Sequence, residues 1–504
     1  MFYLKGIKFK QYQTSYCIFV QSTTAGFFMR KILLIAILLL IHVNLFCQKS
    51  LISNRENLDL RNDDFAIIGK FNHDIISYIK HSDRHFLLVL DSVLKKKRKV
   101  EVPFLNNDCS HIEFFAFEKN CFLFYDVKKG RTLSRYMSKF SNESAFSEPM
   151  RVLEMTQDAN GKMKSFDVYA SENGMYFAVN ATKLVDNYVT AVSVLINYEG
   201  TIEQQIEKVL LNDNWVLSNK MELSNQGEFY WLALKNPSNK GSSEAIKLIV
   251  LRKGAAEFSI QELDLQNYTV NDLNLKLHEK DKVLYVVGTY ANGLYSNSQG
   301  CYLNQYNISS ETFLTPYFAS LLLASGKKDI DMKDLKLKKV SLKQDGGLEI
   351  AMEKSYQQIR TVNSFNSSIN MSMGGMMDNS RIVNEFYYDE IDIFNFGTDG
   401  KLVWSQTVLK NQMSTDDNGI FSSYGCHEYE IGKVYLFSNN SLNSDRLMGA
   451  YVSSKGAMNV KEIPLSMELD NYNLLPRSSV QISKHEIIIP CLSKDYLRLL
   501  KINF

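Results

Sequence analysis

Eight short apolar segments recur along this sequence, and their spacing limits the fold more than any other feature. They begin at Asp74, Cys121, Met175, Glu228, Val283, Leu348, Val434 and Glu486. The intervals between them are 47, 54, 53, 55, 65, 86 and 52 residues, so most lie near 53. A fixed period of this size indicates one supersecondary unit repeated along the chain, with insertions at the two long intervals.

Each repeat has the pattern of four short β-strands. In the third, "KSFDVYA", "GMYFAVN", "YVTAVSVLINYEG" and "TIEQQIEKVLL" follow one another within residues 164–211. A residue-Gly pair separates the last two strands, and Gly adopts the positive φ of two-residue hairpin turns without a Cβ clash. Such pairs occur at Glu199-Gly200, Lys253-Gly254, Asp399-Gly400 and Lys455-Gly456. We therefore interpret Thr398-Asp399-Gly400 as a hairpin corner and not as a calcium site, because the D-x-D-x-D-G ligand spacing is missing.

Four antiparallel strands repeated eight times predict an all-β fold. Residues 48–504 are expected to form a single β-propeller of about eight four-stranded blades, with seven as the near alternative. The last repeat ends at Phe504 after three strands, so a strand from about residues 51–61 should complete its sheet and close the ring. Two separate β-sandwiches are disfavoured, because no Pro/Gly/Ser-rich linker divides the chain.

The first 47 residues are expected to lie outside this fold. Residues 1–28 have the character of an over-long start, and residues 29–47 join a basic beginning to the apolar run "ILLIAILLLI", which is typical of a signal peptide. We expect cleavage before Gln48, export to the periplasm or the cell surface, and no transmembrane segment in the mature chain. The alternative is a lipoprotein acylated at Cys47.

Charge and cysteine spacing exclude several classes of function. The first 47 residues carry five positive charges and no acids, so the chain after them has a net charge of −3 instead of +2. This near-neutral balance argues against nucleic-acid binding. The cysteines have no C-x-x-C spacing, so no zinc or redox motif is expected. Cys109 and Cys121 should lie at opposite ends of a hairpin, which is too far apart for a disulfide.

Two insertions account for the long intervals. Residues 315–328, "TPYFASLLLASGKK", combine a capping Thr, a Pro and a terminal Gly, and predict a short helix between blades five and six. Residues 356–381 are rich in Asn, Ser, Gly and Met, and predict a flexible loop between the second and third strands of blade six. Its methionines, Met371, Met373, Met376 and Met377, suit adaptable contacts with a partner. Cu(I) binding by their thioether groups is the alternative, and the absence of nearby His or Cys argues against it.

The segment carrying these insertions resembles a known group of proteins. The matching stretches within residues 315–440 are "TPYFASLLLASGKK", "VSLKQDGGLEIAMEKSY", "FYYDEIDIFNFGTDGKLVWSQTVLKNQ" and "SSYGCHEYEIGKVYLFSNN". They are similar to a family of uncharacterised exported proteins common in Bacteroidetes-type bacteria. The resemblance implies secretion and an all-β repeat fold, and it implies no activity.

No catalytic motif accompanies the repeats. The sequence lacks G-x-S-x-G, H-E-x-x-H and P-loop patterns, so no cofactor or metal is expected. We expect a monomeric, exported, non-enzymatic recognition propeller for a protein or a cell-surface glycan, with both insertions on one rim. The alternative is a glycan-active enzyme that uses carboxylates at the mouth of the central channel. The expected ligand-binding residues are Tyr387, Tyr388, Asp389, Glu390, Met373 and Met376, against the plainer interpretation of an ordinary strand with an acidic edge.

Overall fold

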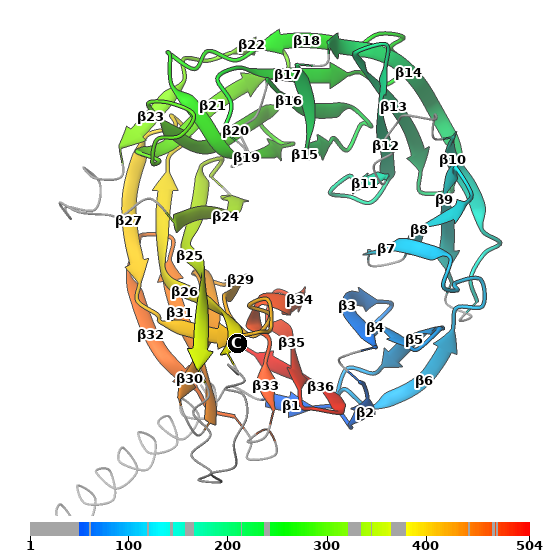
Figure 1. Ribbon diagram of the computed structural model, residues 1–504, viewed down its shortest axis with the longest axis vertical. Helices are drawn as coiled ribbons and strands as arrows, with labels where there is room; N and C mark the ends of the chain where they lie inside the picture. Colours follow the sequence, from blue (N-terminus) through cyan, green and yellow to red (C-terminus); the bar gives the residue numbers. More distant parts are fainter. Residues whose placement is uncertain are drawn as a thin grey trace, which may run out of the picture. The chain divides into compact units, whose positions relative to one another are not determined.

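The predicted repeat is a four-stranded antiparallel sheet. The computed structural model describes residues 50–59, 62–117, 120–141, 145–156, 166–212, 214–235, 242–320, 334–343, 345–363, 380–441, 444–465, 469 and 472–504. These residues form eight sheets that stand around a common axis within the unit Ser50–Ile502 (Figure 1). Each of the eight apolar segments supplies the second strand of one sheet, which confirms the eight-bladed propeller.

The first four blades each contain four strands. Blade 1 is β3 (Asp64–Phe71), β4 (Asp74–His81), β5 (Arg84–Leu90) and β6 (Lys96–Glu101). Blade 2 is β7 (Cys109–Ala116), β8 (Cys121–Lys129), β9 (Thr132–Phe140) and β10 (Met150–Thr156). Blade 3 is β11 (Asp167–Ala170), β12 (Tyr176–Val185), β13 (Tyr188–Asn197) and β14 (Ile202–Asn212). Blade 4 is β15 (Trp215–Leu223), β16 (Phe229–Lys235), β17 (Ile246–Leu251) and β18 (Ser259–Glu262).

Blades 5 and 6 gain an extra strand each. Blade 5 is β19 (Thr269–His278), β20 (Val283–Ala291), β21 (Gly300–Asn307), β22 (Thr312–Phe313) and β23 (Tyr317–Ser320). Blade 6 is β24 (Leu335–Leu342), β25 (Leu348–Asn363), β26 (Ser380–Phe396), β27 (Leu402–Val408) and β28 (Gln412–Thr415).

Blade 7 returns to four strands. They are β29 (Tyr424–Tyr429), β30 (Gly432–Ser441), β31 (Ser444–Ser453) and β32 (Met458–Ile463).

Blade 8 joins the two ends of the described chain. Its C-terminal strands are β33 (Asn473–Leu474), β34 (Val480–Ser483), β35 (Glu486–Leu492) and β36 (Tyr496–Asn503), with the 3-10 helix η3 (Pro476–Ser478) between the first two. Two N-terminal strands, β1 (Ser50–Ile52) and β2 (Glu56–Asn57), pair antiparallel with β36. They lie beside β36 at the bottom of Figure 1. The predicted closure is therefore confirmed, and it covers the edge that β36 would otherwise expose.

The core lies between neighbouring blades, which explains why the central strands are apolar on both faces. Side chains alternate along a strand, so adjacent residues face different blades. On β12, Phe177 packs with Phe122 and Phe124 of blade 2, whereas the next residue, Ala178, packs with Trp231 of blade 4. Equivalent clusters lie between blades 4 and 5, 5 and 6, 6 and 7, 8 and 1, and 1 and 2, and the continuous apolar segments follow from this double burial.

The turns at Gly200, Gly400 and Gly456 are hairpin corners, as expected, but with three loop residues instead of two, whereas Gly254 lies in a longer connection between β17 and β18. The N–H of Gly400 donates to Gly397 O at 3.0 Å, and the N–H of Gly397 donates to Lys401 O at 2.9 Å. This pattern is a type I turn followed by a glycine bulge, and Gly400 has φ of +75°. The corner also contacts blade 5, where Gln305 Nε2 donates to Thr398 O at 3.1 Å. Thr398-Asp399-Gly400 therefore both reverses the chain and joins two blades.

The helix predicted for residues 315–328 is wrong where the structure describes it. Residues 317–320 form β23, which pairs with Gly300–Leu303 of β21. Phe318 packs against Tyr290 and Tyr302, at ring-centroid distances of 5.1 and 5.3 Å. The two-residue β22 leaves part of the β21 edge open, and aromatic residues suit that pleated surface, so tertiary pairing overrides the local capping pattern. Residues 321–328 lie outside the described residues.

The loop predicted for residues 356–381 is shorter than expected. β25 continues to Asn363 and β26 begins at Ser380, so Tyr356 to Asn363 are strand. The two strands pair beyond the blade from Ser355↔Tyr388 to Asn363↔Ser380, and β28 pairs with the same stretch of β26. Alternating polar and apolar residues fit this two-sided ribbon. Residues 364–379 lie outside the described residues.

Cys109 and Cys121 lie on the two paired strands of one hairpin, as expected. In blade 2, Cys109 lies opposite Val127, and Cys121 lies opposite Ala116. The two cysteines are therefore at opposite ends of the β7–β8 hairpin. The segment 29–47 and Cys47 lie outside the described residues, and no helix among those described is long and apolar enough to cross a membrane.

Candidate functional site

The four predicted residues on β26 face different surroundings. Tyr387 and Tyr388 are adjacent in a strand, so their side chains leave it on opposite faces. Tyr387 stacks on Tyr356 with a ring-centroid distance of 4.9 Å and an interplanar angle of 9°, and its hydroxyl donates to Glu385 at 2.9 Å. These contacts show that Tyr387 supports the projecting β25–β26 ribbon.

Tyr388 lies against a cluster of cations. Lys338 Nζ and Lys410 Nζ are 5.7 and 5.8 Å from its ring centroid. The turn at Gly419 crosses so closely that a Cβ there would lie 2.5 Å from the Tyr388 hydroxyl oxygen. Tyr388 is therefore held between strands of blade 6 and the segment that leads into blade 7. Tyr388 thereby contacts Lys338, a side chain that lines a cavity.

Of the remaining predicted residues, the structure describes Asp389 and Glu390, which are adjacent on β26. Partial burial raises the pKa of the Asp389 carboxyl, and the neighbouring charge of Glu390 adds to the rise, while Lys354 and Lys410 oppose it. Met373 and Met376 lie outside the described residues. The residues expected from the sequence therefore lie on blade 6 next to a cavity, and the residues that line this cavity were not among them.

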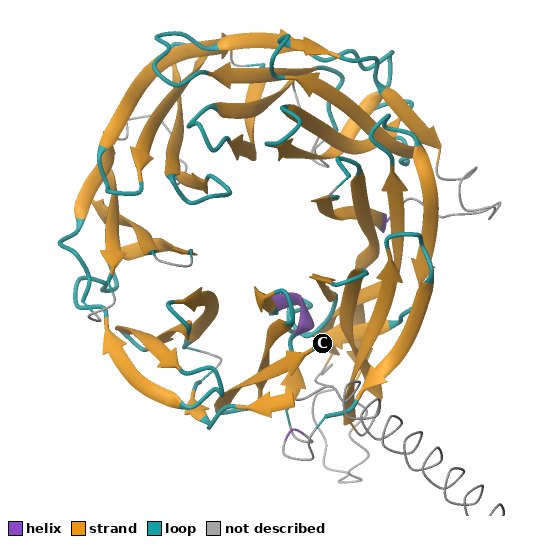
Figure 2. Cartoon of the chain, turned by 180° about the vertical axis from the view of Figure 1, so that it is seen from behind, coloured by secondary structure: helices purple, strands orange, loops and turns teal. Residues whose placement is uncertain are grey.

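That cavity has a volume of about 560 Å³ and is lined by the inner strands of three blades. We call it the blade 6–8 pocket. β24 contributes Lys338 and Lys339, the start of blade 7 contributes Ser423 to His427, and blade 8 contributes Arg477, Ser479, Val480 and Gln481. The short helix η3, which carries Arg477, lies on the inner side of the ring (purple in Figure 2). Cavities of this size commonly hold small ligands or parts of larger ones.

The pocket is positively charged. Three of its lining residues are cationic, and no described residue that lines it is acidic. Lys339 Nζ donates to the backbone carbonyl of Cys426 at 2.8 Å. Lys338 Nζ is 3.7 Å from Glu353, which is fully buried behind the pocket. Arg477 is exposed and has no ion-pair partner among the described residues.

Burial and neighbouring charges change the pKa of the Lys338 ammonium group. Its pKa is lowered chiefly by burial and further by the nearby charges of Lys336 and Arg477, while Glu353 and Asp272 oppose the shift. Like charges held close together repel, and a bound anion would relieve that repulsion. The pocket therefore favours an anionic group.

A buried polar network holds the wall of the pocket. Lys410 Nζ lies 2.9 Å from Glu353 Oε1, and both side chains are buried. Ser423 Oγ donates to Glu353 Oε2 at 2.7 Å, and Lys410 Nζ donates to Tyr388 O at 3.1 Å. The backbone N–H of Ser423 donates to Gln412 Oε1 at 2.9 Å. These bonds fix the first residues of blade 7 against blade 6, so the pocket is preformed.

His427 and Ser479 have the spacing of a catalytic pair but not its chemistry. His427 Nε2 is 2.6 Å from Ser479 Oγ, and the Ser479 hydroxyl donates to Pro476 O. With that proton engaged, Ser479 Oγ is free to accept, and the tautomer of His427 that completes this hydrogen bond carries its proton on Nε2. Burial, with help from the charge of Lys339, lowers the pKa of His427 to about 4. A nucleophilic serine needs a histidine that accepts its proton, so this pair joins blades 7 and 8 without activating Ser479.

Gly425 permits that contact. A Cβ at this position would lie 2.2 Å from Ser479 Oγ and 2.3 Å from Pro476 O. The approach of η3 to β29 therefore requires glycine. The glycine is visible in the sequence as "YGCHEY", but its role could not be predicted, because the segment that packs against it, Pro476–Ser479, is distant in the sequence.

An acidic cluster lies on the inner strands of blades 2 and 3. Arg135 is fully buried, and its Nε donates to Asp126 Oδ1 at 2.5 Å. Arg135 Nη1 is 3.9 Å from Glu113 Oε2. Burial raises the pKa of Glu113 to about 7; Arg135 opposes the rise, and Asp126 and Asp167 add to it. Glu113 is therefore a carboxyl group able to hold a proton near neutral pH.

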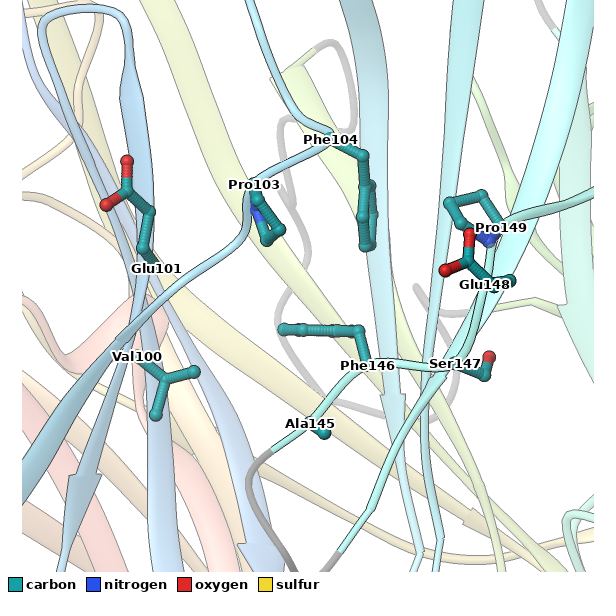
Figure 3. Close-up of a pocket in the computed structure, with 9 residues that line it drawn as sticks. All are labelled: Val100, Glu101, Pro103, Phe104, Ala145, Phe146, Ser147, Glu148 and Pro149. Carbon is teal, nitrogen blue, oxygen red and sulfur yellow. The ribbon is translucent and has the colours of Figure 1, made fainter.

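A further cavity of about 480 Å³ lies at the outer side of blades 1 and 2. Phe104 and Phe146 face one another there at 5.4 Å in an edge-to-face arrangement, beside Pro103 and Pro149 (Figure 3). Glu101, at its border, is already paired with Arg84. The cavity combines this apolar packing with acidic side chains at its border, Glu101 and Glu148, whereas the charged side chains that line the blade 6–8 pocket are cationic.

Comparison with protein-family models and with curated proteins gives no match. Among solved structures, prolyl oligopeptidase B from Galerina marginata is 10% identical over 86% of this chain, with a TM-score of 0.39. This chain spans 56% of the length of that enzyme. An uncharacterized protein from Listeria monocytogenes is 9% identical, with 74% of this chain and 88% of that chain covered and a TM-score of 0.33.

An exo-β-1,3-galactanase from Clostridium thermocellum is 10% identical, with 77% and 78% of the two chains covered and a TM-score of 0.28. The assignment of the fold rests on the strand order and register described above.

Proposed function

We propose that this protein is an exported, non-enzymatic recognition propeller that binds a protein or a cell-surface glycan through the blade 6–8 pocket. The observation that carries the proposal is the preformed cationic pocket in which Arg477 has no ion-pair partner among the described residues. Rigid scaffolds with a few convergent polar groups are typical of binding sites. Export is supported by the apolar run before Cys47 and by the resemblance to exported proteins.

The absence of catalysis is supported by the chemistry of the pocket. Its serine and histidine are hydrogen-bonded in the wrong sense for proton transfer from Ser479, and the low pKa of His427 makes it a poor base at neutral pH. The lysines and Arg477 can hold an anionic group, but they do not form an acid–base pair.

A glycan-active enzyme remains the second candidate, and one observation favours it. Glu113 combines a raised pKa with a position on an inner strand close to Asp126 and Asp167. A protonated carboxyl group beside an ionised one is the arrangement that glycoside hydrolases use. The ion pair of Asp126 with buried Arg135 gives the cluster a structural role as well.

One experiment separates the two functions. Fluorescently labelled neutral and acidic polysaccharides are incubated with the purified protein, and both equilibrium binding and the release of reducing ends are measured. Recognition predicts saturable binding without product. Product release that disappears in Glu113→Gln would replace our proposal with the enzyme. If the protein shows no binding and releases no product, a glycan ligand is rejected.

A further inference from the structure

The blade 6–8 pocket also indicates the chemical class of the ligand. We infer that it binds the anionic group of an acidic saccharide, a carboxylate or a sulfate, and that Arg477 and Lys338 determine this specificity. The inference rests on the proposed binding function and narrows it to one ligand class.

The positions of the cations support an anion directly. Arg477 of blade 8 and Lys338 of blade 6 come from different blades, yet each lines the same cavity. The planar guanidinium of arginine can donate two parallel hydrogen bonds to one carboxylate or sulfate group. Lys338 is partly neutralised by Glu353 at 3.7 Å, whereas Arg477 is not paired with any described residue. Arg477 is therefore expected to supply the larger share of anion affinity.

The rest of the lining favours a saccharide over a peptide. Val480 is the one aliphatic side chain among the described lining residues. The polar side chains of Ser479, Gln481 and His427 already bond to protein atoms. Peptide-binding grooves rely on apolar pockets or on an open strand edge. The oxygens of an acidic saccharide can instead accept from Arg477 and Lys338, which line the cavity of about 560 Å³.

The test compares two anionic saccharides with an uncharged saccharide and an anionic peptide. Binding of oligogalacturonate, dextran sulfate, uncharged dextran and poly-glutamate is measured by titration calorimetry at low and physiological salt. We expect one of the anionic saccharides to bind at least tenfold more tightly than uncharged dextran. Dextran sulfate and uncharged dextran share a backbone, so the difference between them isolates the contribution of the sulfate, and binding of oligogalacturonate alone would indicate a carboxylate. Affinity should fall as salt increases.

Two matched variants locate the site. Arg477→Gln is expected to reduce affinity about tenfold or more, because a charge-assisted hydrogen bond is lost. Arg131→Gln removes the same charge from an exposed turn of blade 2, and should change affinity less than about twofold. Thermal melting of both variants establishes that they are folded.

The outcomes distinguish this inference from the proposed function. Equal binding of charged and uncharged dextrans, unaffected by Arg477→Gln, would overturn the inference but retain a glycan-binding propeller. Binding of poly-glutamate alone, lost in Arg477→Gln, would assign an acidic peptide and reject the saccharide. If Arg131→Gln reduces affinity as much as Arg477→Gln, the anion is held by general surface charge and the pocket assignment is wrong.

Discussion

Lys410 Nζ lies 2.9 Å from Glu353 Oε1, and neither side chain has appreciable contact with solvent. This pair joins the connection between β27 and β28 to β25, the second strand of blade 6, and Glu353 lies 3.7 Å from Lys338 of the blade 6–8 pocket. Removing one partner of a buried ion pair leaves an uncompensated charge. The pair therefore links the stability of the propeller to the shape of its candidate site.

Lys410→Met should destabilise the protein by about 3 to 5 kcal/mol, because Glu353 would remain buried without its closest cation. The measurement is urea unfolding followed by tryptophan fluorescence. The double variant Glu353→Gln/Lys410→Met should recover much of the loss. For comparison, Arg446→Met breaks an exposed pair with Glu462 and should cost less than about 1 kcal/mol. Equal losses in Lys410→Met and Arg446→Met would contradict the assignment.

The glycine corners that join blades can be tested with a matched pair. Gly456 and Gly254 have similar φ, +84° and +79°. An added Cβ at Gly456 would lie 2.9 Å from the Trp404 ring, whereas none of the atoms surveyed lies within 4 Å at Gly254. Both Ala variants should lose about 1 to 2 kcal/mol from backbone strain.

Gly456→Ala should lose more than Gly254→Ala, because it also displaces Trp404, whose Nε1 donates to Ser454 O at 3.1 Å. Thermal unfolding of the two variants measures the difference. Identical melting temperatures would show that the Trp404 contact contributes little to the joint between blades 6 and 7.

Ring closure depends on one buried serine. The backbone N–H of Leu499 donates to Ser53 Oγ at 2.8 Å, and the Ser53 hydroxyl donates to Asn54 O at 2.9 Å. Ser53→Ala leaves the Leu499 N–H without its acceptor and should cost about 1 to 3 kcal/mol. Ser309→Ala, at an exposed turn, should leave the unfolding midpoint nearly unchanged. A silent Ser53→Ala would indicate that β1 and β2 are not required for closure.

His427 predicts a loss of stability in mild acid. Its pKa in the folded protein is about 4, below the ordinary value of 6.5, so the unfolded chain binds the proton more readily. Stability from this group is present above pH 6.5 and decreases as the pH falls toward 4. Between pH 7 and pH 4.5 the loss should be about 2.5 kcal/mol.

Denaturant unfolding at the two pH values checks this expectation. His427→Asn keeps a donor for Ser479 without an imidazole, and should remove most of the difference. The exposed His485→Asn serves as the control and should behave as the unchanged protein. If His427→Asn loses as much stability between pH 7 and pH 4.5 as the unchanged protein, the pH dependence arises from other titratable groups.

The sequence by itself determined the repeated architecture. Blades need a second strand that is apolar on both faces, because it is buried between two neighbours, and this requirement leaves eight recognisable segments. The Gly corners were equally local, since positive φ at Gly200, Gly254, Gly400 and Gly456 is a property of the backbone. Closure by residues near Ser50 followed from the missing fourth strand of the last repeat. These features depend on short-range patterns that any copy of the repeat must satisfy.

Only the tertiary structure decided the pocket and the short elements at its margins. Residues 315–320 carry a capping pattern, yet the open edge of β21 made Tyr317–Ser320 a strand. Lys338 and Arg477 are 139 positions apart in the sequence and have no motif in common, but blades 6 and 8 place them on one cavity. Their proposed role in binding depends on the partial burial of Lys338 and on the proximity of two positive charges, and both are consequences of long-range packing. Local pattern therefore specifies the blade, whereas the arrangement of the blades specifies what the molecule can bind.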